Sequence, residues 1–384
     1  MFSFSGDLEI SKSWMNRALI LKSLSSNIKI KGDSTAEDVQ LLKKALQDFS
    51  ENKTEFYAGL GGTTFRFLAF RLSRQPGEYF IHADKKLLSR PQNEIISILN
   101  QLGVYSELHA DGLKIKSSGW KKPAQNLKIN ATESSQFLTA LALSSLNLDF
   151  DLSIDPIEQI ISEGYFQMTL HMLEKMGIEF GKAKQENQAL TLTGEIDMSS
   201  AFALISAGLL GGTVEITNWI ETSTQPDVQF LNFFKSMNIK FEIKKNIFKI
   251  IQQFNYQAIK ADISNCPDLF PVLSVVCAFA NGESDLFNAP QLKHKESDRI
   301  EKTHELLNRC GFSVEKKFDG LKIQGKPDHV YKFKDVILFD PAGDHRMAMA
   351  AGLLILKGFP IRMPDLNVVR KSYPQFFQHI GILI

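Results

Sequence analysis

The sequence has few of the residues that build metal sites and disulfide frameworks. Its three cysteines, Cys266, Cys277 and Cys310, have no Cys-x-x-Cys spacing. Its eight histidines form no His-x-x-x-His pair and have no neighbouring cysteine. Zinc sites and disulfide-rich domains depend on such spacings. The sequence therefore predicts neither a metal site nor a disulfide framework.

Long apolar runs and an excess of one charge are also missing. No segment approaches the roughly 18 apolar residues of a membrane-spanning helix, and the N-terminus lacks the basic and apolar regions of a secretory signal. Lys and Arg number 44 against 43 Asp and Glu, which gives a net charge of +1. A basic nucleic-acid surface is not indicated. We expect a cytoplasmic monomer without nucleic-acid or membrane partners.

The composition is that of an ordinary globular protein. The chain has 384 residues, of which 43% are hydrophobic and 23% charged, so we expect about two domains. No proline-rich or low-complexity linker interrupts it. The domain boundary should therefore fall inside the repeat pattern, just before Asp197.

One pattern recurs six times: a polar start, a helix of small apolar residues, a short break and a strand. The six predicted helices begin at Ser11, Gly61, Ser134, Asp197, Cys266 and Asp344, and the strands lie at 28–31, 79–81, 149–154, 213–217, 284–287 and 360–363. A second, more amphipathic helix follows polar starts at 35–38, 90–91, 161–163, 223–227, 295–299 and 371–372. This favours a βαβαββ module used six times. The alternative is a series of unrelated α/β units with ordinary caps.

The densest charge cluster is His294-Lys-Glu-Ser-Asp-Arg299, which we place at a helix start. Lys295 and Arg299 would then lie one turn apart, with Glu296 beside them. Free backbone N–H groups and the helix dipole would make this a site for an anion with an acid nearby. The alternative is a solvated, salt-bridged helix face.

Chemically versatile side chains gather at the other helix starts as well. They are Lys12, Ser13 and Arg17; Gly62 and Thr63; Arg90; Ser134, Ser135 and Gln136; Ser162 and Tyr165; Asp268; His345 and Arg346; and Lys371. Cations in a first helical turn run against the dipole, which suggests that a bound anion restores the balance. The number of cations predicts substrates that carry phosphates and carboxylates.

Two carboxylates, Asp268 and Glu296, would stand in this cationic site and be available for proton transfer. Several of these residues also have a purely structural explanation when each is taken alone. Ser134 and Ser135 could be plain N-caps, Gly61-Gly62 a simple turn, and His345 the partner of a cap.

The sequence resembles the enolpyruvyl transferases and, within them, the EPSP synthase (3-phosphoshikimate 1-carboxyvinyltransferase) family. The resemblance is carried by SKSWMNR at 11–17, GGTTFR at 61–66, SRP at 89–91, SSQFLTA at 134–140, KESDR at 295–299, DHRMAM at 344–349 and KSYP at 371–374. These motifs occur in family order and cover essentially the whole chain.

The resemblance implies a fold class as well as an activity. The fold would be α/β, a two-domain inside-out α/β barrel with six βαβαββ modules, three per domain. Residues 1–11 with 197–384 would form one domain and 12–196 the other, with the active site in the interdomain cleft. The activity would be transfer of the enolpyruvyl group of phosphoenolpyruvate to shikimate 3-phosphate. The reaction needs no cofactor and no metal.

The resemblance also assigns residues, one by one. Shikimate 3-phosphate would be held by Lys12, Ser13, Arg17, Ser134, Ser135, Gln136, Ser162, Tyr165, Asp268, Gln291 and Lys295. Phosphoenolpyruvate would be held by Lys12, Gly62, Arg90, Gln136, Arg299, Arg346 and Lys371. Asp268 would be the proton acceptor and Glu296 the proton donor, with Lys12 and Lys371 also catalytic.

The chain departs from the family pattern at five residues. Glu9-Ile10 replaces Pro-Gly, Leu60 and Gln291 each replace Asn, and Glu163 replaces Lys. The acid, the base and the matched cations remain, so we expect an active enzyme. One alternative is the sister transferase acting on UDP-N-acetylglucosamine, whose usual reactive cysteine is missing from 84–89. The other is a catalytically silent protein that binds shikimate 3-phosphate, motivated by Leu60 and the short N-terminus.

Overall fold

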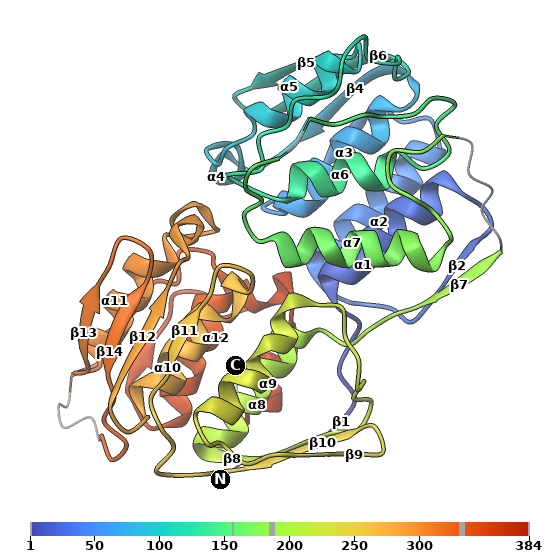
Figure 1. Cartoon of the computed structure of the whole chain (residues 1–384). Helices are drawn as coiled ribbons and strands as arrows, with labels where there is room; N and C mark the ends of the chain where they lie inside the picture. Colours follow the sequence, from blue (N-terminus) through green and yellow to red (C-terminus); the bar gives the residue numbers. More distant parts are fainter. Residues whose placement is uncertain (1, 156, 184–188, 330–334, 383–384) are drawn as a thin grey trace. The chain divides into compact units, whose positions relative to one another are not determined.

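Figure 1 shows the computed structural model, which describes residues 2–155, 157–183, 189–329 and 335–382 of this mixed α/β protein. The chain divides into two compact units. Unit 1 is Met1–Glu9 with Ile196–Ile384, and unit 2 is Ile10–Glu195. Their bounds lie two residues and one residue from the predicted domain bounds, which stay a prediction.

Unit 2 alternates helices with short strands. Its elements are α1 (Lys12–Leu24), β2 (Ile28–Lys31), α2 (Glu37–Ser50), β3 (Glu55–Tyr57), α3 (Gly62–Ser73), β4 (Pro76–His82), α4 (Lys85–Leu88), α5 (Asn93–Gln101), β5 (Tyr105–His109), β6 (Gly112–Ser118), α6 (Gln136–Ser144), α7 (Glu163–Lys175) and β7 (Leu190–Thr193).

Unit 1 has the same alternation. Its first part comprises β1 (Phe2–Gly6), α8 (Met198–Gly211), β8 (Gly212–Ile216), η1 (Pro226–Gln229), α9 (Phe230–Ser236), β9 (Glu242–Lys244) and β10 (Ile247–Ile251). The next comprises β11 (Lys260–Asp262), η2 (Pro267–Leu269), α10 (Phe270–Ala278), β12 (Glu283–Phe287), η3 (Pro290–His294), α11 (Arg299–Arg309), β13 (Ser313–Lys316) and β14 (Leu321–Gln324). The last comprises β15 (Ile337–Leu338), α12 (His345–Leu356), β16 (Ile361–Arg362), η4 (Asn367–Lys371) and α13 (Phe376–His379).

Three four-stranded sheets repeat one topology. Their strand orders are β3-β4-β6-β5, β1-β8-β10-β9 and β11-β12-β14-β13. In each sheet the first two strands are parallel, while the last two form an antiparallel hairpin that pairs with the second strand. A parallel pair needs a crossover helix and a hairpin needs a short turn. Three of the six predicted modules therefore have the full βαβαββ order.

The other parallel contacts are smaller. They are the two-stranded sheets β2-β7 and β15-β16, and a single bridge between Leu127 and Ile154. The predicted strand at 149–154 is wrong, because only Ile154 pairs with another strand segment. Its alternating sequence has the period of a strand, but the segment bonds to two different neighbours without forming a continuous ladder. Leu127 pairs with the backbone of Ser153 and Asp155, and the Leu152 amide donates to the Gly181 carbonyl at 2.8 Å.

Many predicted site residues lie close to helix starts, so we compare the predicted starts with those in the structure. Ser11 caps α1 as predicted, with its hydroxyl 3.3 Å from the Trp14 amide. The predicted start at Lys295 is wrong. Asp298 is the N-cap of α11, which begins at Arg299, so Lys295 and Glu296 lie in the bend before the helix. Lys371 likewise ends η4 instead of beginning a helix.

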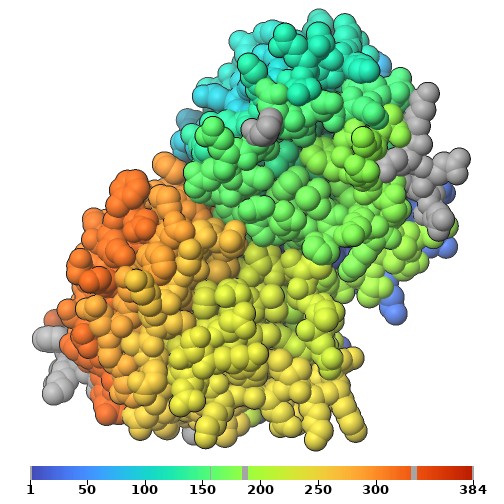
Figure 2. All heavy atoms as spheres, in the orientation of Figure 1, coloured from blue at the N-terminus to red at the C-terminus, as the bar shows by residue number. Residues whose placement is uncertain are grey.

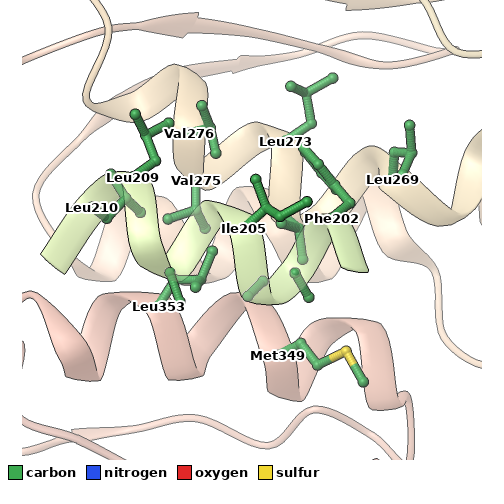
Figure 3. Close-up of a cluster of buried hydrophobic side chains, with 14 of the residues drawn as sticks. Phe202, Ile205, Leu209, Leu210, Leu269, Leu273, Val275, Val276, Met349 and Leu353 are labelled. Atoms are coloured by element: carbon green, nitrogen blue, oxygen red, sulfur yellow. The ribbon is translucent and has the colours of Figure 1, made fainter. Parts of the chain in front are cut away.

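The core of unit 1 lies between three helices that are apolar on all sides. Figure 3 shows Phe202, Ile205 and Leu209 of α8 packed between side chains of α10 and α12, such as Leu273 and Leu353. A helix that is hydrophobic all round is stable only when neighbours cover it on every side. This explains why the charged residues of these three helices lie at their starts.

Unit 2 has an equivalent core around α1, α3 and α6. Figure 2 shows one outer face of the molecule in the orientation of Figure 1. Almost all of α3 is buried, including Arg66 between Phe65 and Phe67. Among the described residues, no helix has the length and apolar character needed to cross a membrane.

Candidate active site

In unit 1, one buried guanidinium connects three carboxylates. Arg299 is 1% exposed. Its Nη1 lies 2.7 Å from Asp268 Oδ1, its Nη2 3.2 Å from Glu296 Oε2, and its Nε 2.9 Å from Asp344 Oδ2. The alternative of a solvated, salt-bridged helix face is therefore wrong for this cluster. We call the group of Asp268, Glu296, Arg299, Asp344, Arg346 and Lys371 the carboxylate cluster.

The two further cations of the carboxylate cluster each contact one of the predicted catalytic acids. Arg346 Nη2 lies 3.3 Å from Asp268 Oδ2, and Lys371 Nζ lies 2.8 Å from Glu296 Oε1. Each carboxylate is thus held between Arg299 and a second cation. Such charge-assisted contacts fix the position of both oxygens.

The charges around Asp268 control its protonation. Burial by itself raises the pKa of this carboxyl, but Arg299, Arg346 and Lys295 together outweigh burial and hold the pKa well below its ordinary value of 3.8. The same pairing raises the pKa of Arg299, although burial opposes it. Asp268 is therefore ionised at neutral pH, as a proton acceptor must be.

Arg346 has hydrogen-bond donors that no described residue accepts. Its side chain is 2% exposed, and its Nε and Nη1 are buried without a hydrogen-bond partner among the described residues. Asp344, the N-cap of α12, accepts a hydrogen bond from the Arg346 backbone amide at 2.9 Å. His345 directly follows this cap as the first residue of α12, and its role stays a prediction.

Gln291 and Lys295 lie at the edge of this group. Gln291 on η3 donates from Nε2 to the Ser264 carbonyl at 2.9 Å, and its buried Oε1 has no partner among the described residues. Lys295 acts on Asp268 through its charge. A buried amide oxygen without a donor is costly, so a ligand hydroxyl could satisfy it.

In unit 2, two of the cations assigned to substrates lie on α1. Lys12 Nζ is 3.1 Å from Asp38 Oδ2. Arg17 is held by neutral groups: Nε donates to Thr169 Oγ1 at 2.8 Å, Nη1 to the Ser13 carbonyl at 2.7 Å and Nη2 to the Tyr165 carbonyl at 2.8 Å. Burial lowers the pKa of Arg17 to about 9.

A second arginine organises the start of α6. Arg66 Nη1 donates to Gln136 Oε1 at 2.8 Å and to Ser134 Oγ at 3.3 Å, and Gln136 Nε2 lies 3.1 Å from Thr63 Oγ1. The Arg66 guanidinium also stacks 4.6 Å from the centre of the Phe137 ring. These contacts fix Gln136, which is assigned to both substrates.

The remaining predicted residues of unit 2 lie at bends and helix starts. Gly62 begins α3, which has no side-chain cap, and a Cβ atom on Gly62 would lie 3.2 Å from Arg90 Nη1. Ser135 Oγ donates to the Ser162 carbonyl at 3.1 Å instead of capping α6, so the plain N-cap alternative is not what Ser135 does. Ser162 has φ of +56°, which is uncommon outside glycine and often marks a functional position.

No site role is predicted from the sequence for Asp38, Arg66 or Asp344, which position the residues named above. Arg66 could have been noticed as a charge inside an apolar helix, and Asp344 as an N-cap residue before His-Arg. Asp38 carries no local signal, because its contact with Lys12 joins α2 to α1. In the described ranges, His, Cys, Asp and Glu form no group of three or more that could hold a metal ion.

These features can be compared with known proteins. The family model for EPSP synthase (3-phosphoshikimate 1-carboxyvinyltransferase) matches residues 15–380. The chain belongs to the EPSP synthase family. The resemblance that the sequence motifs indicated is therefore confirmed at the level of the family.

Curated relatives extend over most of the chain. The 3-phosphoshikimate 1-carboxyvinyltransferase of Sulfurovum sp. (strain NBC37-1) is 29% identical and covers 96% of this chain and 93% of its own length. The protein of the same name from Pyrococcus furiosus is 31% identical and covers 84% of this chain and 80% of its own.

Solved structures of the EPSP synthase type have the same fold. The enzyme from Acinetobacter baumannii matches with a TM-score of 0.72 at 20% identity, covering 98% of this chain and 95% of its own. The enolpyruvyl transferase NikO from Streptomyces tendae also matches with a TM-score of 0.72, at 14% identity, over 99% of this chain and 94% of its own. At these identities the likeness concerns the fold alone.

Proposed function

We propose that the protein transfers the enolpyruvyl group of phosphoenolpyruvate to the 5-hydroxyl of shikimate 3-phosphate, releasing phosphate. The single observation that carries the chemistry is the carboxylate cluster, in which Asp268 and Glu296 share Arg299 and each contact a second cation. Membership in the EPSP synthase family supplies the substrates.

The two carboxylates have opposite tasks. Glu296 begins this step in its protonated form and gives that proton to the methylene carbon of phosphoenolpyruvate, which leaves cationic character on the adjacent carbon. The 5-hydroxyl attacks that carbon and gives its proton to Asp268. In the elimination, Glu296 takes a proton back from the new methyl group, the bond to phosphate breaks, and the departing phosphate takes the proton from Asp268, which returns both carboxylates to their starting states. Positioned groups of this kind contribute roughly 10²- to 10⁴-fold to a rate.

Substrate binding itself would prepare the base. A carboxylate whose pKa is held very low is a weak proton acceptor. Phosphoenolpyruvate brings several negative charges to the cations that hold Asp268, and this offsets part of their effect on its pKa. Asp268 thus gains basicity when the substrate that needs it arrives.

The two arginines of the carboxylate cluster would have different roles, one in orienting the carboxylates and one in binding phosphoenolpyruvate. Every nitrogen of the Arg299 guanidinium contacts one of its three carboxylates, so this side chain orients the acid and the base. Arg346 has two buried nitrogens without partners in the described residues. We assign the stronger hold on phosphoenolpyruvate to Arg346, while Arg299 can contact that substrate only by exchanging a partner.

The residues assigned to substrates come from both units. Lys12, Arg17 and Gln136 belong to unit 2, whereas Asp268 and Lys295 belong to unit 1. We propose that the units are the two domains of an inside-out α/β barrel and that shikimate 3-phosphate draws them together. A ligand shifts such an equilibrium by its differential affinity for the two states. Small-angle scattering should show a smaller radius of gyration with saturating ligand, and a Lys295→Ala variant should weaken the response.

Phosphate release tests the activity directly. Purified protein with shikimate 3-phosphate and phosphoenolpyruvate should release one phosphate per enol ether formed, and UDP-N-acetylglucosamine should not replace shikimate 3-phosphate. Tight binding of shikimate 3-phosphate without phosphate release would instead favour the silent binding protein. Asp268→Asn should abolish release, whereas Asp262→Asn, an exposed aspartate on β11, serves as the matched control.

A further inference from the structure

A basic cavity lies in unit 2, at the end of α1 away from Lys12. Its volume is about 620 Å³, and its walls come from the C-terminal half of α1, the C-terminal half of α2 and the end of α3. These three helices pack against one another (Figure 1). Lys12 and Lys22 are ten residues apart on α1, which is about 15 Å along the helix axis. The cavity is therefore separate from the residues assigned to substrates.

The charged residues of this cavity are all basic. Lys22, Lys43 and Arg71 line it, and none of its described lining residues is acidic. Lys43 pairs with the exposed Asp33, while Lys22 makes no ion pair in the described part of the chain. The C-terminal helix ends carry partial negative charge, on the order of half a unit each. Lys22 and Arg71 pair with no carboxylate in the described part of the chain, and their two charges outweigh that partial charge.

Arg71 is the decisive residue because it is a buried cation without an anion. It is 5% exposed, its Nε and Nη2 bind the Ser23 hydroxyl and carbonyl at 2.7 and 2.9 Å, and its Nη1 has no partner among the described residues. Burial, with Arg74 nearby, lowers the pKa of Arg71 to about 10. A buried charge is normally paired, so an anion from outside would complete this site.

The other wall of the cavity is apolar. Leu19, Leu46 and Phe49 line it, and the Phe49 ring centre lies 4.9 Å from the Arg71 guanidinium. A bare inorganic ion would leave this wall unused. Pockets that combine apolar walls with a few charged groups bind organic molecules of matching character.

We propose that this cavity binds a small organic anion, with a carboxylate facing Arg71 and Lys22 and an aromatic or aliphatic body against Leu46 and Phe49. Arginine suits a planar carboxylate because its fork of N–H donors can bind both oxygens. The proposal does not depend on the enolpyruvyl transfer reaction, because none of these residues has been assigned to it.

The probe for the test is 4-fluorobenzoate, followed by fluorine NMR with the full-length protein. Lys22→Glu should weaken its binding at least about fivefold, the scale of one reversed charge close to a bound anion. The matched control is Lys44→Glu, which makes the same charge change one residue beyond Lys43, on a side chain that is 72% exposed and does not line the cavity. It should change the affinity less than twofold.

Two further measurements separate this cavity from the active site. Lys371→Met and saturating shikimate 3-phosphate should both leave 4-fluorobenzoate bound. The uncharged 4-fluorobenzyl alcohol should bind at least about fivefold more weakly than the carboxylate. The proposal is overturned if the alcohol binds equally well, if either active-site change displaces the probe, or if Lys22→Glu and Lys44→Glu behave alike. Arg71→Gln, where it folds, should abolish binding.

Discussion

Replacing Glu296 with glutamine removes the proposed proton donor and changes little else in shape. Glu296 lies 3.2 Å from Arg299 Nη2 and 2.8 Å from Lys371 Nζ, and its side chain is 15% exposed. A glutamine can offer its oxygen to one of these cations but turns an N–H toward the other. The mismatch should lower the free energy of unfolding by about 1 to 3 kcal/mol, which leaves the protein folded.

The effect on catalysis should be larger and of a different kind. Without a proton donor, kcat should fall by roughly 10²-fold or more, whereas the Kd for shikimate 3-phosphate should stay within about twofold, because Glu296 is not assigned to that ligand. Single-turnover phosphate release and titration calorimetry measure the two quantities separately. Glu301→Gln is the matched control, since Glu301 lies on α11 with 51% of its side chain exposed and pairs with Lys316. A kcat for Glu296→Gln within a few-fold of the wild type would refute the assignment.

Three further outcomes follow from the same contacts. Gly62→Ala should raise the KM for phosphoenolpyruvate about tenfold, because the new Cβ would lie 3.2 Å from Arg90 Nη1 and displace it; an unchanged KM in steady-state assays would contradict this. Asp344→Asn should cost about 3 to 5 kcal/mol in urea unfolding, because it leaves the buried Arg299 short of a charge. The pKa of Asp268 is held well below 3.8, so its contribution to stability should be complete above about pH 5 and lost as the pH falls below 4. Acid unfolding of Asp268→Asn should be less steep in that range.

Features that depend on neighbouring residues in the sequence were predictable. The apolar helices and their polar starts follow from composition, and Ser11 is an N-cap because its side chain reaches an amide three residues ahead. The predicted start of α11 at Lys295 is wrong, although the local sequence also carries the signal of the correct start. Asp298 and Glu301 have the spacing of a capping box, and the Asp298 side chain accepts a hydrogen bond from the Glu301 amide at 3.0 Å.

Features that depend on distant residues were not predictable from local patterns. Arg299 contacts Asp268 and Asp344, which are 31 and 45 positions away. Local spacing therefore suggested a pair with Lys295, while the fold supplies three carboxylates. The strand prediction at 149–154 is wrong for the converse reason. The segment has the alternation of a strand, but its backbone bonds go to two separate segments, at Leu127 and Gly181, and do not form the continuous ladder that a strand needs.

The distribution of counter-charges indicates which side chains await a substrate. A cation at a helix start runs against the helix dipole, which predicts that it needs an anion nearby. In unit 1 the protein supplies its own, because Arg299 and Arg346 both contact Asp268. Arg17 differs, since its hydrogen-bond partners among the described residues are all neutral and burial lowers its pKa to about 9. A guanidinium has five N–H donors, so Arg17 retains donors for a ligand. We infer that an anionic group of shikimate 3-phosphate supplies the missing charge at Arg17, whereas the cations of unit 1 mainly hold the two carboxylates that move protons.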